Sequence, residues 1–298
     1  MKILLTGGHG FFGRHIWRAL EAADHTIVAP SSRDMDCRAR YAVDTFTRTR
    51  PDVIIHAAAE CGGIGANRAA GPRFFDENIR MGVNVLSSAW ENCPEAYVIA
   101  MGTVCSYGAV PPRIPFVEED VYTGDPEPTN RAYAEAKRAL YRYADILSSH
   151  GMRTVCPLVA NLYGPAERSD EGGHVIGSIV AKMKRAKAEG RESVTLWGTG
   201  TPTRDFLHVT DAALAMVALV DYQPTGLINI GTGVETSILE LAEEVKRLVG
   251  YEGRIEWDTT QPDGQQRRVM DTTRAVDLLG WRARIELMGA AYGLESVI

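Results

Sequence analysis

The sequence has neither a basic run nor an apolar segment long enough to cross a membrane. Its 298 residues carry 32 lysines and arginines against 38 aspartates and glutamates, a formal net charge of −6. An acidic chain without basic patches binds nucleic acid poorly, so any phosphate must be held by a few placed groups. No apolar run reaches the roughly 20 residues that span a bilayer, and no secretory leader is recognisable. We therefore expect a soluble, cytoplasmic protein with neither nucleic-acid nor membrane partners.

Cysteine is also scarce, and the five cysteines form no Cys-x-x-Cys pair. An odd number of widely spaced thiols does not suit a disulfide framework and indicates a reducing compartment. The same spacing argues against a structural zinc site, so no metal is expected. The five positions are Cys37, Cys61, Cys93, Cys105 and Cys156.

A glycine-rich turn near the N-terminus carries the first functional signal. It follows an apolar run at residues 3–5 and precedes an amphipathic segment at 15–20, which gives the order strand, turn, helix. Glycines there let the backbone turn sharply and approach a dinucleotide diphosphate, which the helix N-terminus can bind. The alternative is that these glycines serve packing alone. The cofactor-binding residues predicted in this turn are Gly7, His9, Gly10, Phe11, Phe12 and Gly13.

Apolar runs alternate with helical segments along the first 230 residues. The strands are expected at residues 25–29, 53–56, 96–101, 155–159 and 227–231, and helices at 41–50, 72–92 and from 129 onward. Between residues 60 and 67 we expect a glycine-rich loop. Strict alternation of this kind predicts the α/β class, with a doubly wound parallel sheet covered by helices on both faces.

Two further segments are placed to contact a dinucleotide. The second strand ends in Ser31-Ser32-Arg33 and meets no acidic residue until Asp34. An acid at this point would bind the ribose 2′-hydroxyl, whereas hydroxyls and a cation accommodate a 2′-phosphate. These residues favour NADP, NAD stays possible, and the alternative is a solvated turn. The small residues Ala57, Ala58 and Ala59 after the third strand would let the backbone lie against the cofactor.

A hydroxyl, a phenol and an ammonium form the candidate catalytic set. Tyr133 and Lys137 are four residues apart, so they share one face of a helix, and Thr103 lies at a strand exit 30 residues upstream. A nearby ammonium favours phenolate, so we expect Lys137 to lower the pKa of Tyr133, which would exchange a proton with a carbonyl oxygen. Cys105, two residues after Thr103, can face the same cleft.

Taken together, these motifs resemble the extended short-chain dehydrogenase/reductase family, in particular the nucleotide-sugar epimerase/reductases of the GDP-L-fucose synthase group. The resemblance covers nearly the whole chain. Three departures are Thr103, where the group has serine, and His9 and Ser31, where it has arginines. Further matching segments are Gly62-Gly63-Ile64, Glu127-Pro128-Thr129-Asn130, Asn161-Leu162-Tyr163-Gly164-Pro165, Trp197-Gly198-Thr199-Gly200-Thr201-Pro202 and Pro262-Asp263-Gly264.

The resemblance implies an organisation and a reaction. Residues 1–160 would form an NAD(P)-binding Rossmann domain, and residues 161–298 mainly a smaller C-terminal α/β substrate domain, with part of 204–235 packing back on the first. The implied reaction is NADPH-dependent epimerisation at C3 and C5 of a nucleotide-diphosphate 4-keto-6-deoxy sugar, followed by reduction at C4. The protein would be a homodimer. The resemblance implies that Cys105 and His174 transfer the protons at the sugar ring. The implied substrate contacts are Asn161, Lys182, Trp197 and Arg204. Arg267, in a polar turn, could also reach phosphate.

Several alternatives stay open from the sequence. The enzyme could invert a single carbon, or act as a 4-reductase on another nucleotide-linked ketosugar such as a GDP-heptose. By composition alone, His174 could be a structural residue and Arg204 could form a surface ion pair with Asp205. A cofactor-binding regulatory protein without turnover is a further class, but such a protein would be expected to lose part of the set Thr103, Tyr133 and Lys137, and all three are present.

Overall fold

The computed structural model describes residues 1–165 and 174–287, and its main body is a six-stranded sheet in which every pairing is parallel. The strand order is β10-β5-β4-β3-β1-β2, so the chain leaves β1 toward one edge and returns on the other side to β3. The doubly wound sheet predicted from the sequence is confirmed. The strands are β1 (Lys2–Thr6), β2 (Thr26–Val28), β3 (Val53–His56), β4 (Tyr97–Ala100), β5 (Thr154–Val159) and β10 (Gly226–Ile230).

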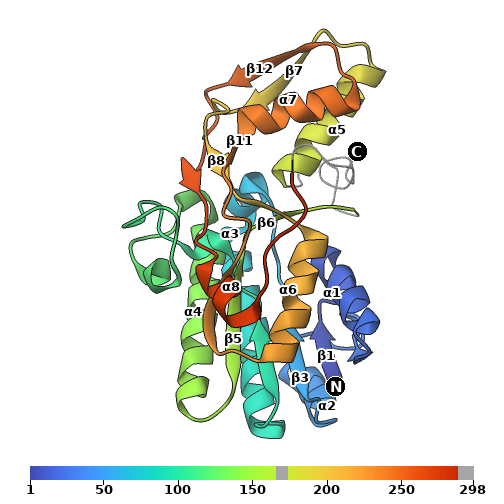
Figure 1. Cartoon of the computed structure of the whole chain (residues 1–298), viewed down its shortest axis with the longest axis vertical. Coiled ribbons are helices and arrows are strands. Elements are labelled where there is room, and N and C mark those ends of the chain that lie inside the picture. Colours follow the sequence, from blue (N-terminus) through green and yellow to red (C-terminus); the bar gives the residue numbers. More distant parts are fainter. Residues whose placement is uncertain (166–173, 288–298) are drawn as a thin grey trace.

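Helices cover both faces of this sheet, which explains why its central strands are continuous apolar runs (Figure 1). On one face α3 and α4 pack together with α2 beside α3, and on the other α1 packs against α6. All residues of β3, β4 and β5 are buried. The helices are α1 (Phe11–Ala22), α2 (Arg40–Thr47), α3 (Ile64–Asn92), α4 (Arg131–Ser149), α6 (Val209–Tyr222) and α8 (Thr273–Leu279).

Helix α3 consists of two helical stretches, and the one predicted from about Pro72 is preceded by a shorter one that was not predicted from the sequence. The shorter stretch starts at Ile64, so the expected glycine-rich loop over residues 60–67 ends at Gly63. A kink at Ala70, with φ −127° and ψ 25°, precedes the proline. Proline lacks the N–H that a continuous helix needs and its ring crowds the preceding turn, so the first stretch ends at the kink and the second begins close to Pro72.

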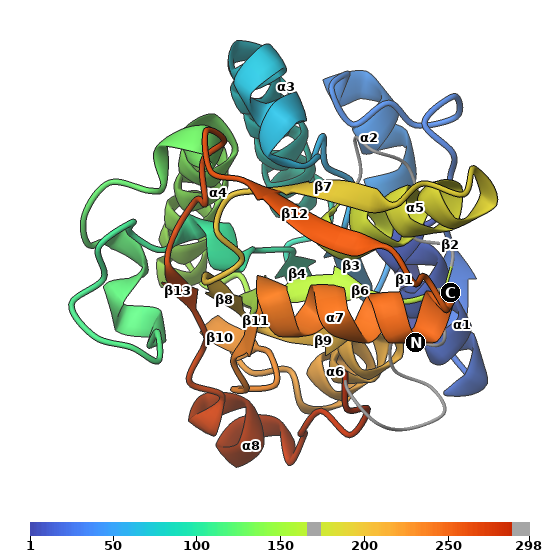
Figure 2. The same cartoon turned by 90° about the horizontal axis from the view of Figure 1, so that it is seen from above.

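A smaller α/β part stands above the carboxyl ends of the main strands (Figures 1 and 2). It has its own apolar core, to which Met183, Leu196 and Val245 contribute. Two segments of the predicted substrate domain, residues 166–173 and 288–298, lie outside the described residues. Its elements are α5 (Val175–Ala188), α7 (Ile238–Val249) and the parallel pair β7 (Ser193–Trp197) and β12 (Arg254–Asp258).

Short elements connect the two parts. β6 pairs with β9, and β8 lies between β11 and β13. Three 3₁₀ helices follow β4 and lead into α4. The elements are β6 (Asn161–Tyr163), β8 (Thr203–Arg204), β9 (Phe206–His208), β11 (Thr236–Ser237), β13 (Arg267–Arg268), η1 (Val104–Ser106), η2 (Glu118–Tyr122) and η3 (Pro128–Asn130).

Two features are absent from residues 1–165 and 174–287. No helix in these ranges is both long and apolar enough to pass through a membrane. Nor do three or more histidine, cysteine, aspartate or glutamate side chains gather there in a way that would hold a metal ion.

A buried histidine at the end of β3 makes the fold sensitive to acid. His56 is 1% exposed, and its Nδ1 lies 2.8 Å from Thr6 Oγ1. Burial, together with the Lys137 charge, lowers the pKa of His56 to about 3 from 6.5. Between those two values the unfolded chain binds a proton that the folded chain does not, so stability should fall as pH decreases through this window. The loss is up to about 1.4 kcal/mol for each pH unit.

Urea unfolding at several pH values between 6.5 and 4 checks this expectation. His56→Gln should flatten the dependence of the free energy of unfolding on pH, whatever it does to stability at pH 7. His150→Gln, which changes an exposed histidine at the end of α4, is the control and should leave the slope unchanged. An unaltered slope in the His56 variant would assign the acid sensitivity to other groups.

Candidate active site

The glycine turn after β1 is pressed between α1 and the chain that leaves β3. Gly7 has φ +70°, and a Cβ added to it would lie 2.6 Å from the Ala58 nitrogen and 2.8 Å from the Ala57 carbonyl carbon. A Cβ on Gly13 would lie 2.0 Å from the Gly7 oxygen, and Gly10 N–H donates to that oxygen at 2.9 Å. No side chain caps the N-terminus of α1. The turn therefore leaves the backbone N–H groups at the start of α1 uncapped, at the point where the strand order reverses. Such an arrangement suits a dinucleotide diphosphate.

Aromatic residues surround the same turn. His9 is exposed, and its Nε2 lies 3.1 Å from the Ala29 carbonyl oxygen, which ties the turn to the end of β2. The His9 ring meets Trp17 edge to face at 5.8 Å. Phe11 and Phe12 open helix α1 and are half-buried. The backbone of the turn is therefore fixed by contacts on both sides.

The end of β2 presents hydroxyl and cationic groups. Ser31 donates its hydroxyl to Asp34 Oδ2 at 2.6 Å and its N–H to the same oxygen at 3.3 Å. These hydrogen bonds lower the pKa of Asp34 and occupy its carboxylate. Ser32 and Arg33 stay exposed beside them. Asp34, the first acidic residue after β2, is thus engaged by Ser31, while the Arg33 side chain remains exposed to solvent.

The predicted catalytic set gathers at the carboxyl end of β4. Lys137, from α4, donates its Nζ to the Met101 carbonyl at 2.9 Å and lies 5.8 Å from the centre of the Tyr133 ring. Thr103 opens η1 and its Oγ1 accepts the Cys105 N–H at 3.2 Å. A threonine hydroxyl that accepts one bond keeps its own hydrogen for another partner. The strand exit and the helix thus place a hydroxyl, a phenol and an ammonium around one region.

Burial dominates the electrostatics of the tyrosine and the lysine. It raises the pKa of Tyr133 well above 10, with smaller contributions from Cys61 and Cys105, and it lowers the pKa of Lys137 to about 8. The net shift of the Tyr133 pKa in this structure is therefore upward, and Lys137 is not among the groups that cause it. The ammonium is turned toward the Met101 carbonyl, and both groups have lost solvation. Tyr133 is held as a neutral phenol, the form that donates a proton.

Cys105 and His174 come from different parts of the molecule. Cys105 lies in η1 and is half-buried, and Arg268 Nη1 donates to its Sγ at 3.3 Å. His174 precedes α5 as its N-cap and is exposed. Partial desolvation by the surrounding protein lowers the pKa of His174 below 6.5, so the ring is mainly neutral at pH 7.

Arg204 points inward and makes no ion pair with its neighbour. Its Nη1 donates to the backbone oxygens of Thr203 at 2.8 Å and Gln265 at 2.6 Å. Burial lowers the pKa of Arg204 to about 9. Asp205 instead accepts the N–H and hydroxyl of Thr232, at 3.0 and 2.7 Å. The alternative of a surface ion pair between Arg204 and Asp205 is therefore wrong.

The two consecutive arginines of β13 have different surroundings. Arg267 is exposed and forms a two-point ion pair with Glu235, at 2.9 and 2.6 Å. Arg268 is 6% exposed and reaches Cys105. Neighbouring residues of a strand point to opposite faces. The structure thus favours Arg268 over the predicted Arg267 as the arginine beside Cys105, and no signal in the sequence indicates which of the two faces inward.

Three other predicted substrate contacts lie in the smaller part or in the elements that connect it to the sheet. Asn161 Nδ2 donates to the backbone oxygen of Asp205 at 3.0 Å. Lys182 Nζ donates to the Thr195 carbonyl at 3.0 Å, which joins α5 to β7. Trp197 ends β7 with 51% of its surface exposed. A half-exposed indole at a strand end is available for stacking on a ring.

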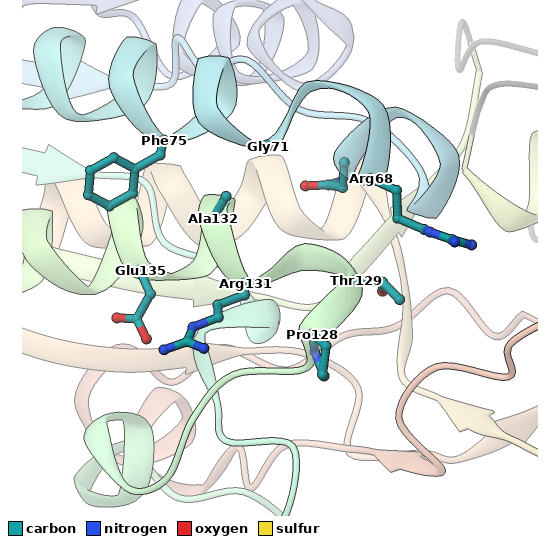
Figure 3. Close-up of a pocket in the computed structure, with 9 residues that line it drawn as sticks. Arg68, Gly71, Phe75, Pro128, Thr129, Arg131, Ala132 and Glu135 are labelled. Carbon is teal, nitrogen blue, oxygen red and sulfur yellow. The ribbon is translucent and has the colours of Figure 1, made fainter.

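A cavity of about 560 Å³ lies between the start of α3 and the start of α4 (Figure 3). Tyr133, Cys105 and His174 are not among its lining residues. The buried Asn67 Oδ1 has no hydrogen-bond partner, a feature that the sequence did not indicate. The lining residues are Asn67, Arg68, Gly71, Phe75, Pro128, Thr129, Arg131, Ala132 and Glu135.

Comparison with known proteins places the chain in a family. Residues 3–231 match the NAD dependent epimerase/dehydratase family. GDP-L-fucose synthase 1 of Arabidopsis thaliana is 37% identical over 291 residues, which cover 96% of this chain and 89% of the relative. A GDP-6-OMe-4-keto-L-xylo-heptose reductase from C. jejuni superposes with a TM-score of 0.89 at 25% identity, over 99% of this chain and 95% of that one.

A second solved structure carries a nucleotide. A GDP-L-fucose synthetase from Naegleria fowleri bound to NADP superposes with a TM-score of 0.83 at 25% identity, over 99% of this chain and 91% of that one. The family match covers most of the described chain, and the curated relative matches it almost from end to end. The chain belongs to the NAD dependent epimerase/dehydratase family.

Proposed function

We propose that this protein is an NADPH-dependent epimerase/reductase that acts on a nucleotide-diphosphate 4-keto-6-deoxy sugar. The observation that carries the proposal is the arrangement at the exit of β4, where Thr103 contacts Cys105, Lys137 contacts the Met101 carbonyl, and Tyr133 is close enough to Cys105 for their charges to interact. A plain reductase needs Thr103, Lys137 and Tyr133 alone. The additional thiol suits proton transfer at carbon, and the names of the near-full-length relatives support the same reaction.

The residues around the glycine turn would hold the cofactor. The diphosphate would lie against the α1 N-terminus, and Ser32 and Arg33 would meet a 2′-phosphate, which favours NADPH over NADH. The NADP-bound relative supports this choice. When bound, NADPH supplies the hydride for the reduction. Lys137 is placed to hold the nicotinamide ribose, since its ammonium lies between Met101 and the Tyr133 ring.

The protein's own groups would move the protons. A ketone at C4 acidifies the hydrogens at C3 and C5, so Cys105 and His174 can remove a proton from one face and return it to the other. Tyr133, kept neutral by burial, then donates a proton to the C4 oxygen, while the Thr103 hydroxyl hydrogen-bonds to that oxygen. Arg204 would bind the nucleotide diphosphate, for which a planar guanidinium is suited.

A second candidate keeps the fold and changes the sugar. The heptose reductase from C. jejuni superposes on 99% of this chain, so a GDP-heptose 4-reductase is the alternative. The presence of both Cys105 and His174 favours the epimerising reaction. Under the alternative, one or neither ring carbon would be inverted.

One incubation separates the candidates. Purified protein is mixed with GDP-4-keto-6-deoxy-mannose and NADPH in deuterated water, and the product is read by NMR. Oxidation of NADPH with deuterium at both C3 and C5 is the expected result. Deuterium at one carbon, or oxidation without exchange, would favour the single-centre or reductase reading. Absence of NADPH oxidation with this sugar and with 4-keto-heptoses would contradict enzymatic function and favour a regulatory protein.

We also propose that the protein is a homodimer that pairs through α3 and α4. These helices pack on each other and expose Phe75 and Val83, each 43% accessible, and Ile146, 55% accessible. Phe75 and Val83 are eight residues apart and so share a helix face. Glutamate at both positions should convert the dimer to a monomer in sedimentation equilibrium. Leu239→Glu, an equally exposed site on α7, is the control; a double variant that stays dimeric would place the interface elsewhere.

A further inference from the structure

Arg268 is fixed beside the Cys105 thiol by a short chain of hydrogen bonds. Its Nη1 donates to Cys105 Sγ at 3.3 Å, and its Nε donates to Gln265 Oε1 at 3.1 Å. Gln265 Nε2 in turn donates to the Gly108 carbonyl at 2.9 Å. Both Arg268 and Gln265 are 6% exposed. The guanidinium is therefore immobilised at the sulfur, although 163 residues of chain separate the two side chains.

A second guanidinium strengthens the positive field at this place. Arg204 and Arg268 are close enough that Arg268 contributes to lowering the pKa of Arg204. The carboxylates that act on Arg204 are Glu127 and Asp263, and each already accepts hydrogen bonds from a threonine, Thr129 and Thr199 respectively. A buried guanidinium in contact with a sulfur, with the Arg204 charge nearby, favours an anion at that sulfur, because a thiolate offsets the repulsion between the cations.

We propose that Arg268 is a positioning residue which fixes the Cys105 sulfur and favours its ionisation, and so prepares it as the base of epimerisation. This proposal rests on the proposed function and names the residue that activates its base. Within the described residues, the titratable groups that act on the Cys105 region are Arg268 from β13, Arg204 from β8, Tyr133 and Tyr141 from α4, and Cys61 from the loop after β3. Of these groups, the two arginines are the cations.

The thiolate can be tested without any substrate. Alkylation of the free protein by iodoacetamide is followed from pH 5.5 to 9, and the peptide that contains Cys105 is quantified by mass spectrometry. Arg268→Gln should slow its modification at pH 7 at least ten-fold and move the midpoint of the pH profile upward by about one unit or more, while Arg268→Lys should restore part of the rate. Arg267→Gln removes the neighbouring guanidinium, which is paired with Glu235, and should leave the profile unchanged.

The substrate assay then links the thiolate to the reaction. In Arg268→Gln, deuterium exchange at the sugar ring should fall at least ten-fold, whereas NADPH oxidation with a ketosugar that is already epimerised should fall far less. An unaltered alkylation profile in a folded Arg268→Gln protein would overturn the inference. If the alkylation profile depends on Arg268 but no ketosugar is turned over, the effect of Arg268 on Cys105 is supported and the proposed function is contradicted. Failure of the inference and failure of the proposed function are therefore distinguishable.

Discussion

Replacing Tyr133 by phenylalanine should lower the rate of ketone reduction by roughly 10²- to 10⁴-fold, the usual contribution of a positioned general acid. The hydroxyl is the group that protonates the C4 oxygen, and burial keeps it in its neutral form because its pKa is raised well above 10. Phenylalanine retains the ring that lies 5.8 Å from Lys137 Nζ, so binding of the cofactor should change little. Single-turnover oxidation of NADPH measures the chemical step directly.

Tyr143→Phe provides a matched control on the same helix. Tyr143 is half-buried and packs against the apolar core of the sheet, so its variant should reduce the ketone at the normal rate. Deuterium exchange at C3 and C5 should survive in Tyr133→Phe, since proton transfer at carbon belongs to other groups. A rate within three-fold of the unmodified protein would mean that another group delivers the proton.

The fold was predictable because its signals are local. Alternating apolar runs and helices, with glycines 7, 10 and 13 after the first run, predicted the doubly wound sheet, and the structure confirms it. Glycine is required in this turn because backbone segments approach each other closely. A Cβ on Gly13, for example, would lie 2.0 Å from the Gly7 oxygen. Such constraints act between residues that are close in the sequence, and they restrict which residue types can occur there, so they can be recognised from the sequence.

Features that depend on long-range packing could not be predicted in the same way. Consecutive arginines at 267 and 268 look alike in the sequence, and only the pairing of β13 with β8 decides which one is buried. The pKa of Tyr133 follows from burial by surrounding elements rather than from the lysine four residues away. The site residues themselves stay predictions, supported by their positions.

In the reaction that we propose, one set of groups transfers protons at carbon and another reduces the ketone. Replacing Cys105 by serine should abolish deuterium exchange at the ring, with an expected loss of at least about a hundred-fold, because a serine hydroxyl is a far weaker acid than a thiol and does not ionise near neutral pH. Hydride transfer to an already epimerised 4-keto sugar should be spared, since Tyr133, Lys137 and Thr103 remain.

Both activities can be measured on the same variant, exchange by NMR and hydride transfer by the absorbance of NADPH. Cys93→Ser makes the same change at a thiol that ends α3, before the amino end of β4, and should leave exchange within a few-fold of normal in the folded protein. Equal loss of exchange and hydride transfer in Cys105→Ser would contradict the division of labour, because it would mean that the thiol supports the arrangement of the whole site. Loss of exchange alone would assign the proton transfers at carbon to the sulfur that Arg268 contacts.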